Sequence, residues 1–194
     1  LKELRVTGGE PLMSGYTWQL LDWFKENRGR STTRLAINSN LGEQCDIDRL
    51  LESTQGLEFD LYTSNEAVNT QAEYIRDGLN WKAWINNMHR LASSGQLRGL
   101  HVMCTINALC LPTITEFLDM IMISKEQYGK SWPTVTLNIL RFPSFQSPLV
   151  LPLEYRKNVV KNLQKWYTKN GESNLLHDME RQHILRLITY LDTV

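Results

Sequence analysis

Residues 7–13, Thr7-Gly8-Gly9-Glu10-Pro11-Leu12-Met13, stand between a short apolar run and a segment with helical periodicity. This position predicts a loop that joins a strand to a helix. Two adjacent glycines have no side chains, so a ligand can come close to the backbone. Exposed carbonyl groups and the Glu10 carboxylate would accept hydrogen bonds from a cationic group such as an ammonium. The same residues also fit a plain tight turn, because short glycine motifs recur by chance.

Length and composition narrow the class of protein. A chain of 194 residues can bury a sizeable core and fits one domain, or one domain and an appendage. Lysine plus arginine and aspartate plus glutamate both number 21, and no basic tail or stripe is apparent, so we expect no nucleic-acid partner. The most apolar run, residues 117–123, is interrupted by Asp119 and is too short to cross a bilayer. With no visible signal peptide, we expect a cytoplasmic protein with no membrane partner.

The cysteines and histidines do not form a recognisable metal site. Cys45, Cys104 and Cys110 are odd in number, and their spacing fits neither a zinc site nor a disulfide framework. Reduced cysteines in a cytoplasmic protein are the simplest interpretation. The four histidines also lack motif spacing. We therefore assign no metal ligand in this chain.

Apolar periodicity predicts alternating strands and helices along the whole chain. We expect strands near residues 2–6, 34–37, 57–61, 100–106 and 134–140, and helices near 15–27, 46–53, 80–94, 113–127, 153–168 and 173–191. The first helix should bury Tyr16, Leu20, Leu21 and Phe24, and Thr113 with Glu116 should form a capping box. Such alternation indicates an α/β fold with a parallel sheet and right-handed crossovers. A doubly wound sheet and a curved partial barrel both fit.

All five predicted strands end in small polar residues. In either fold, ligands bind beyond the carboxyl ends of the strands. A single polar strand end is ordinary loop chemistry, but five on one rim favour a ligand site. These ends are residues 7–10, 38–40, 62–66, 105–107, and Asn138 with Arg141.

At this point the sequence resembles the radical S-adenosylmethionine (radical SAM) enzymes. Residues 6–13 resemble their second-strand motif, and Asn38-Ser39-Asn40 is similar to their third-strand ending. Residues 72–78 with the tryptophan-containing helix after them, and residues 136–143 with Leu151-Pro152, resemble the branch that carries a C-terminal twitch domain. The resemblance extends over about residues 2–168. It implies a partial TIM-like (β/α) barrel core in residues 1–168, and a helix in 169–194 that leads to a missing auxiliary domain.

The sequence departs from this family in one large respect. The family's Cys-x3-Cys-x2-Cys loop, which holds a [4Fe-4S] cluster and precedes the glycine motif, does not occur here. We expect that the first strand and the cluster loop lie upstream of Leu1. The twitch domain would lie beyond Val194. This chain alone would then be inactive.

The resemblance also implies roles for individual residues. In the family, a reduced [4Fe-4S] cluster cleaves S-adenosylmethionine to give a 5′-deoxyadenosyl radical, which abstracts hydrogen from a substrate. By analogy with the twitch branch, the substrate is a peptide. No catalytic residue is assigned. The resemblance suggests that the cofactor-binding residues are Gly8, Gly9, Glu10, Pro11, Ser39, Asn40, Ser64 and Asn107, and that the substrate-binding residues are Asn38, Arg76, Asn138 and Arg141.

Three of these assignments carry detail or a competing interpretation. Gly8, Gly9 and Glu10 would receive the methionine ammonium. Ser64 competes with Thr63 for the ligand's carboxylate or ribose. Arg76 would clamp a carboxylate, or else would form a surface ion pair with Glu73.

Two other classes of function fit the same residues. One is a cluster-free, non-catalytic relative that uses the rim to bind a nucleotide or a partner protein. The other is an unrelated barrel hydrolase with Glu10 and either Glu66 or Asp60 as its acid–base pair. The hydrolase would need two carboxylates that face each other.

Overall fold

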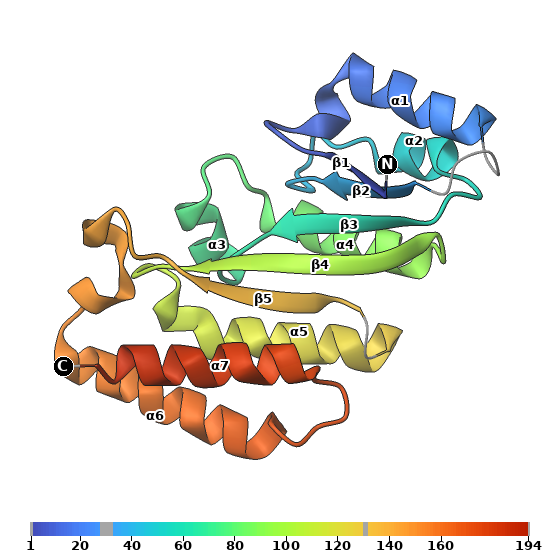
Figure 1. The fold of residues 1–194 in the computed structure, drawn as a ribbon. Coiled ribbons are helices and arrows are strands. Elements are labelled where there is room, and N and C mark those ends of the chain that lie inside the picture. Colours follow the sequence, from blue (N-terminus) through green and yellow to red (C-terminus); the bar gives the residue numbers. More distant parts are fainter. Residues whose placement is uncertain (1, 28–32, 130–131, 194) are drawn as a thin grey trace. The chain divides into compact units, whose positions relative to one another are not determined.

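The computed structural model describes residues 2–27, 33–129 and 132–193 (Figure 1). Strands and helices alternate, as the sequence predicts. Short 3-10 helices, labelled η, occur in the loops. In chain order the elements are β1 (Glu3–Val6), η1 (Pro11–Met13), α1 (Gly15–Glu26), β2 (Arg34–Asn38), α2 (Ile47–Ser53), β3 (Phe59–Ser64), α3 (Asn69–Ile75), α4 (Trp81–Ser93), β4 (Leu97–Ile106), η2 (Leu111–Thr113), α5 (Ile114–Tyr128), β5 (Thr134–Ile139), η3 (Ser144–Gln146), η4 (Pro148–Val150), α6 (Leu153–Asn170) and α7 (Asp178–Leu191).

The order of the strands decides between the two predicted folds. The sheet has five parallel strands in the sequential order β1-β2-β3-β4-β5. A doubly wound sheet reverses its strand order at a switch point, whereas a barrel adds its strands in sequence. The sequential order therefore confirms the α/β partial barrel.

The chain divides into two compact units. The first comprises Leu1–Thr63 with Gly78–His101, and the second comprises Ser64–Asp77 with Val102–Val194. The boundary expected after residue 168 stays a prediction. No helix in the described ranges has both the length and the apolar character needed to cross a membrane.

In the first unit, β2 pairs in parallel with both of its neighbours, and its register places Ala36 between Arg5 and Asp60.

Helix α1 packs through Thr17, Trp18, Leu21 and Phe24. The prediction for Tyr16 is wrong, because its side chain is 83% exposed. The buried face of α1 is centred on Trp18 and Leu21, which turns Tyr16 toward solvent.

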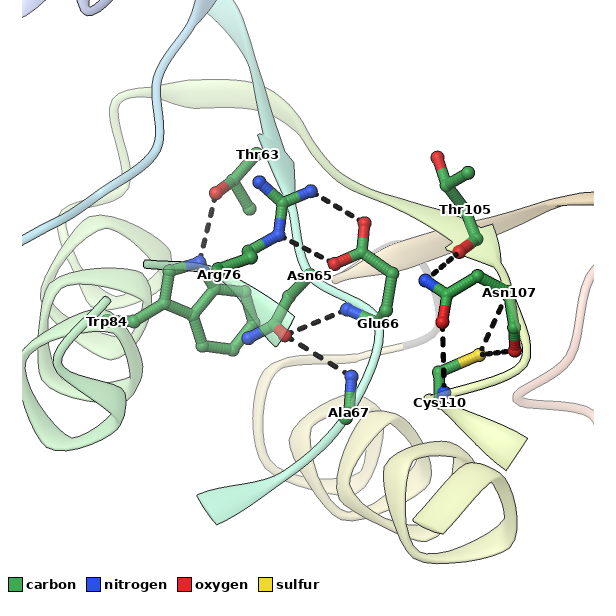
Figure 2. A network of polar contacts seen from close by, with 9 residues as sticks. All are labelled: Thr63, Asn65, Glu66, Ala67, Arg76, Trp84, Thr105, Asn107 and Cys110. Carbon is green, nitrogen blue, oxygen red and sulfur yellow. Dashed lines mark hydrogen bonds and ion pairs between the residues drawn. The ribbon is translucent and has the colours of Figure 1, made fainter. Parts of the chain in front are cut away.

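Helix α4 supports two of the strand ends in the first unit. Trp84 is fully buried, and its indole Nε1 donates a hydrogen bond of 3.0 Å to Thr63 Oγ1 at the end of β3 (Figure 2). Asn87 Nδ2 donates to the carbonyl oxygens of Leu41 and Gly42, in the loop that follows β2. Trp84 therefore belongs to the core of the first unit. The polar contacts of α4 also hold the loop in place.

In the second unit, side chains of α7 bind the outer edge of β5. Glu180 Oε1 accepts a hydrogen bond of 2.8 Å from Val135 N, and Glu180 Oε2 lies 3.0 Å from Lys125 Nζ. Farther along, His183 Nδ1 accepts from Leu137 N, and Arg186 donates to Leu137 O. Both members of the Lys125–Glu180 ion pair are fully buried. We call Glu180, His183 and Arg186 the α7 edge clasp.

The capping boxes differ from the sequence prediction. Thr113 precedes α5 but makes no side-chain cap hydrogen bond, so the predicted box with Glu116 is wrong. Instead, His177 and Glu180 form a capping box at the start of α7. Thr113 is followed by a glutamate three residues later, as a capping box requires, but its hydroxyl finds no hydrogen-bond partner in the described part of the chain.

Candidate functional site

The glycine loop after β1 and the loop after β2 are joined through one carboxylate. Glu10 Oε1 accepts hydrogen bonds of 3.0 Å from Leu12 N and from Ser39 Oγ. Glu10 Oε2 accepts one of 2.7 Å from Asn40 N. We call this set of contacts the Glu10 clasp. The structure thus brings Glu10, Ser39 and Asn40 together, as the sequence predicts for one rim.

The polar residues after β2 also shape their own turn. Ser39 Oγ accepts from Leu41 N at 3.1 Å, and Asn40 Oδ1 accepts from Gly42 N at 2.8 Å. Leu41 has a positive φ of 51°, a conformation that these local bonds stabilise. Asn38 Oδ1 is buried and finds no donor within the described residues. An acceptor in this position is suited to a donor from a ligand.

The geometry of the two glycines leaves space above the loop. Gly8 and Gly9 have positive φ values of 95° and 49°, which only glycine adopts readily. A Cβ atom added to either would meet nothing within 4 Å. A carboxylate has about four acceptor positions, and the Glu10 clasp uses three of them. The loop can therefore still accept a cationic group at Glu10, next to open backbone.

Cys45 lies against the Glu10 clasp but is poorly suited to chemistry. Its Sγ is 3.5 Å from Ser39 Oγ and 3.4 Å from Asn40 Oδ1. Burial raises the pKa of the Cys45 thiol to about 11. Burial likewise raises the pKa of Cys110 to about 12, and that of Cys104 well above its ordinary value. All three cysteines are free and buried, so each is a protonated thiol at neutral pH.

The raised pKa values predict that the cysteines react slowly in the folded chain. At about pH 8, a thiol with a pKa near 11 is ionised in roughly one molecule in a thousand. We expect iodoacetamide to label less than one cysteine per chain over a time in which glutathione reacts fully. In denaturant, all three should be labelled. Intact-mass spectrometry measures both outcomes, and rapid labelling of Cys45 in the folded chain would contradict the assigned burial.

In the second unit, the segment after β3 carries a partly buried ion pair (Figure 2). Arg76 Nε lies 2.6 Å from Glu66 Oε2, and Arg76 Nη2 lies 2.6 Å from Glu66 Oε1. The Glu66 side chain is 4% exposed, whereas that of Arg76 is 32% exposed. The structure therefore gives Arg76 a bidentate partner in Glu66, where the sequence suggested Glu73. Arg76 clamps a carboxylate, but this carboxylate belongs to the protein.

Asn65 is a polar residue in this network that the site prediction did not include. It is fully buried, and its Oδ1 accepts hydrogen bonds from the backbone N–H groups of Glu66 and Ala67. Its Nδ2 has no acceptor in the described chain. An asparagine directly after a strand and before a turn is the signal that could have indicated this role.

The remaining predicted site residues differ in how they are engaged. Ser64 ends β3, is half-buried, and makes no hydrogen bond through its hydroxyl to a described residue, whereas Thr63 is fully buried against Trp84. Asn107 Oδ1 accepts from the backbone N–H groups of Leu109 and Cys110, so it shapes the turn after β4 (Figure 2). Two residues are exposed: Asn138 within β5, and Arg141, whose guanidinium lies 5.9 Å from the centroid of the Tyr190 ring.

The structure gives no support to the hydrolase interpretation. Arg98 donates to both carboxylate oxygens of Asp60, and Arg76 does the same for Glu66. Glu10 is bound by its own three donors. Asp60 and Glu66 are thus each held by an arginine, so neither is a free partner for Glu10 in an acid–base pair.

Comparisons with known proteins identify the fold. No family model matches the sequence, and no curated protein matches it. The solved structure of native anSMEcpe with bound AdoMet and Cp18Cys peptide is similar, with a TM-score of 0.55 at 12% identity over 89% of this chain and 48% of that one. A domain of pyruvate-formate lyase-activating enzyme from Bacteroides vulgatus ATCC 8482 has a TM-score of 0.53 at 13% identity, over 85% of this chain and 94% of that one. This chain therefore spans about half the length of anSMEcpe.

These structural neighbours are radical SAM enzymes. At such low identity the likeness establishes the fold, and the chain has the partial barrel of the radical SAM type. The twitch branch stays a prediction. What a neighbour binds does not follow from a shared fold alone.

Proposed function

We propose that this chain is the S-adenosylmethionine-binding part of a radical SAM enzyme whose substrate is a peptide. The fold supports this proposal, as does the presence of AdoMet and a peptide in a structural neighbour. The observation that carries it is the Glu10 clasp beside the two open glycines. Such a loop is suited to an ammonium group, and S-adenosylmethionine carries one.

The residues of the first unit would bind the methionyl part of the cofactor. In our proposal, the ammonium donates to Glu10 and to backbone carbonyls of Gly8 and Gly9. The orphaned Asn38 Oδ1 would accept a hydrogen bond from the ligand. Pro11 follows at the start of η1 and fixes the backbone, while Ser39 and Asn40 hold Glu10 in place.

For the residues of the second unit, the resemblance suggests hydrogen bonds to carboxylate and ribose groups. Ser64 has a hydroxyl available for hydrogen bonding, and Arg76 keeps Nη1 after Glu66 has taken Nε and Nη2. Asn107, whose side chain shapes its turn, would lie near the adenosine. Asn138 and Arg141 are exposed and remain the candidates for substrate contact.

S-adenosylmethionine together with a [4Fe-4S] cluster supplies the radical chemistry of such enzymes. In residues 2–27, 33–129 and 132–193, no group of three His, Cys, Asp or Glu side chains could hold a metal ion. These residues therefore do not fit the cluster, and we derive no step through it. In our proposal the cluster ligands belong to another part of the enzyme, and this chain alone binds the cofactor without cleaving it.

Titration of S-adenosylmethionine into the chain tests the proposal. Glu10→Gln should weaken binding by roughly ten- to a hundredfold, because one charge-assisted hydrogen bond, worth about 1.5–3 kcal/mol, is lost. Gly9→Val should abolish binding, because its branched side chain occupies the open space above the loop. Calorimetry gives the affinities, and thermal melts of each variant report folding.

Matched controls separate binding from strain. Gly78 also has a positive φ, 79°, and open space around its Cβ position, so Gly78→Val adds comparable strain outside the proposed site. Glu43→Gln removes the same charge from an exposed residue close in sequence to Asn40. Both controls should bind normally. Wild-type chain that does not bind, or Glu10→Gln that binds normally, would contradict the proposal.

A competition experiment distinguishes this proposal from the alternative, a cluster-free and non-catalytic relative. A loop that receives the methionyl group should release S-adenosylmethionine when methionine is added. A rim that binds only a nucleotide should instead respond to adenosine triphosphate and ignore methionine. The second result would favour the non-catalytic relative.

A further inference from the structure

A groove lies between α5 and α6 in the second unit. It has a volume of about 290 Å³ and is lined by Thr115, Asp119, Asn162, Lys165, Trp166 and Lys169. Trp166 is its buried member, at 6% exposure. Trp166 Nε1 donates a hydrogen bond of 2.7 Å to Asp119 Oδ1, which links the two helices and fixes the indole ring.

One wall of this groove belongs to a row of lysines. Lys161, Lys165 and Lys169 follow one another at intervals of four residues on α6, and all three are exposed. None of them lies within ion-pair distance of a described carboxylate, whereas Lys157, one step earlier, pairs with Glu154 at 3.5 Å. The expectation of no basic stripe is therefore wrong for α6. The interval of four residues is the signal in the sequence that reveals it.

The spacing of the lysines constrains what could bind them. Residues four apart on a helix are displaced by about 6 Å along its axis. An acidic helix with carboxylates at the same interval can meet each ammonium in turn. Lys161 does not line the groove, so the row extends beyond it and favours an extended ligand over a small anion.

We propose that the α5–α6 groove and its lysine row dock an acidic amphipathic helix of a partner protein. Carboxylates of that helix would face Lys161, Lys165 and Lys169, and an apolar side chain would contact the aliphatic stems of Lys165 and Lys169, which line the groove. A nucleic acid is disfavoured because the row offers only three ammonium groups and the formal net charge of the chain is zero. This inference is independent of the proposed S-adenosylmethionine site.

A synthetic helix serves as the probe. We choose a labelled peptide of about five turns, with glutamates at four-residue intervals beside a leucine stripe. A second peptide has the same composition in scrambled order. Fluorescence anisotropy should show salt-sensitive binding of the first peptide to the wild-type chain. The double variant Lys165→Glu/Lys169→Glu should weaken that binding by at least about tenfold.

The control changes the net charge of the chain by the same amount, at two lysines outside the row. Lys2 and Lys82 are exposed lysines of the first unit, and Lys2→Glu/Lys82→Glu should leave binding unchanged. Equal loss in both double variants would show a nonspecific charge effect and overturn the proposal. Equal binding of the scrambled peptide would do the same, as would tighter binding of a single-stranded oligonucleotide. Thermal melts confirm that all variants are folded.

Discussion

Replacing Glu180 with alanine is expected to lower the free energy of unfolding by about 3–5 kcal/mol. The Glu180 carboxylate accepts hydrogen bonds from Val135 N and His177 N and pairs with Lys125 Nζ, all within a fully buried environment. Without it, the Lys125 ammonium loses the carboxylate that it contacts, and the Val135 N–H at the edge of β5 loses its acceptor. Equilibrium unfolding in urea, followed by circular dichroism, measures the change.

Two further variants test the origin of this effect. Glu172→Ala removes an exposed carboxylate before α7 and should change the free energy by less than about 0.5 kcal/mol. In Lys125→Met/Glu180→Gln, the buried charges are gone and the amide oxygen can still accept from the backbone, so this double variant should be more stable than Glu180→Ala. If Glu180→Ala costs no more than Glu172→Ala, the buried ion pair does not support the fold as described.

Trp84→Ala is expected to cost a similar amount, about 3–5 kcal/mol, because it removes the largest fully buried side chain of the first unit and leaves a cavity. Trp84→Phe keeps most of the volume but loses the hydrogen bond to Thr63 Oγ1, so a smaller cost of about 1–3 kcal/mol is expected. Trp23→Ala is the control, since Trp23 is 51% exposed on α1. Unfolding in urea again gives the free energies. A loss in Trp23→Ala equal to that in Trp84→Ala would argue against the assigned core.

The arrangement of strands and helices was largely predictable from the sequence, because burial repeats with the period of each element. The period of two in β3, where Phe59, Leu61 and Thr63 are buried, is an example. Helix α3 was not predicted. Its residues 69–75 bury only Ala72, so the segment has no apolar face that would indicate a helix. Apolar periodicity indicates a helix through its buried face. A helix that buries almost no side chains shows no such periodicity.

The candidate site was predictable only in part, for a related reason. The ends of parallel strands share a rim, which correctly grouped Glu10 with Ser39 and Asn40. Nothing local connects Glu66 with Arg76, which is ten residues away and across a short helix. Such a pair depends on tertiary geometry, and so does the orphaned amide of Asn65. Whether these residues bind a ligand stays a prediction.

The α7 edge clasp has a consequence for how this sheet could be extended. Glu180, His183 and Arg186 occupy the N–H groups of Val135 and Leu137 and the carbonyl of Leu137, which a sixth strand would need. A strand supplied by any other polypeptide would have to displace α7 and its buried ion pair before it could pair with β5. The β5 edge is therefore closed to the recruitment of a foreign strand for as long as α7 stays in place.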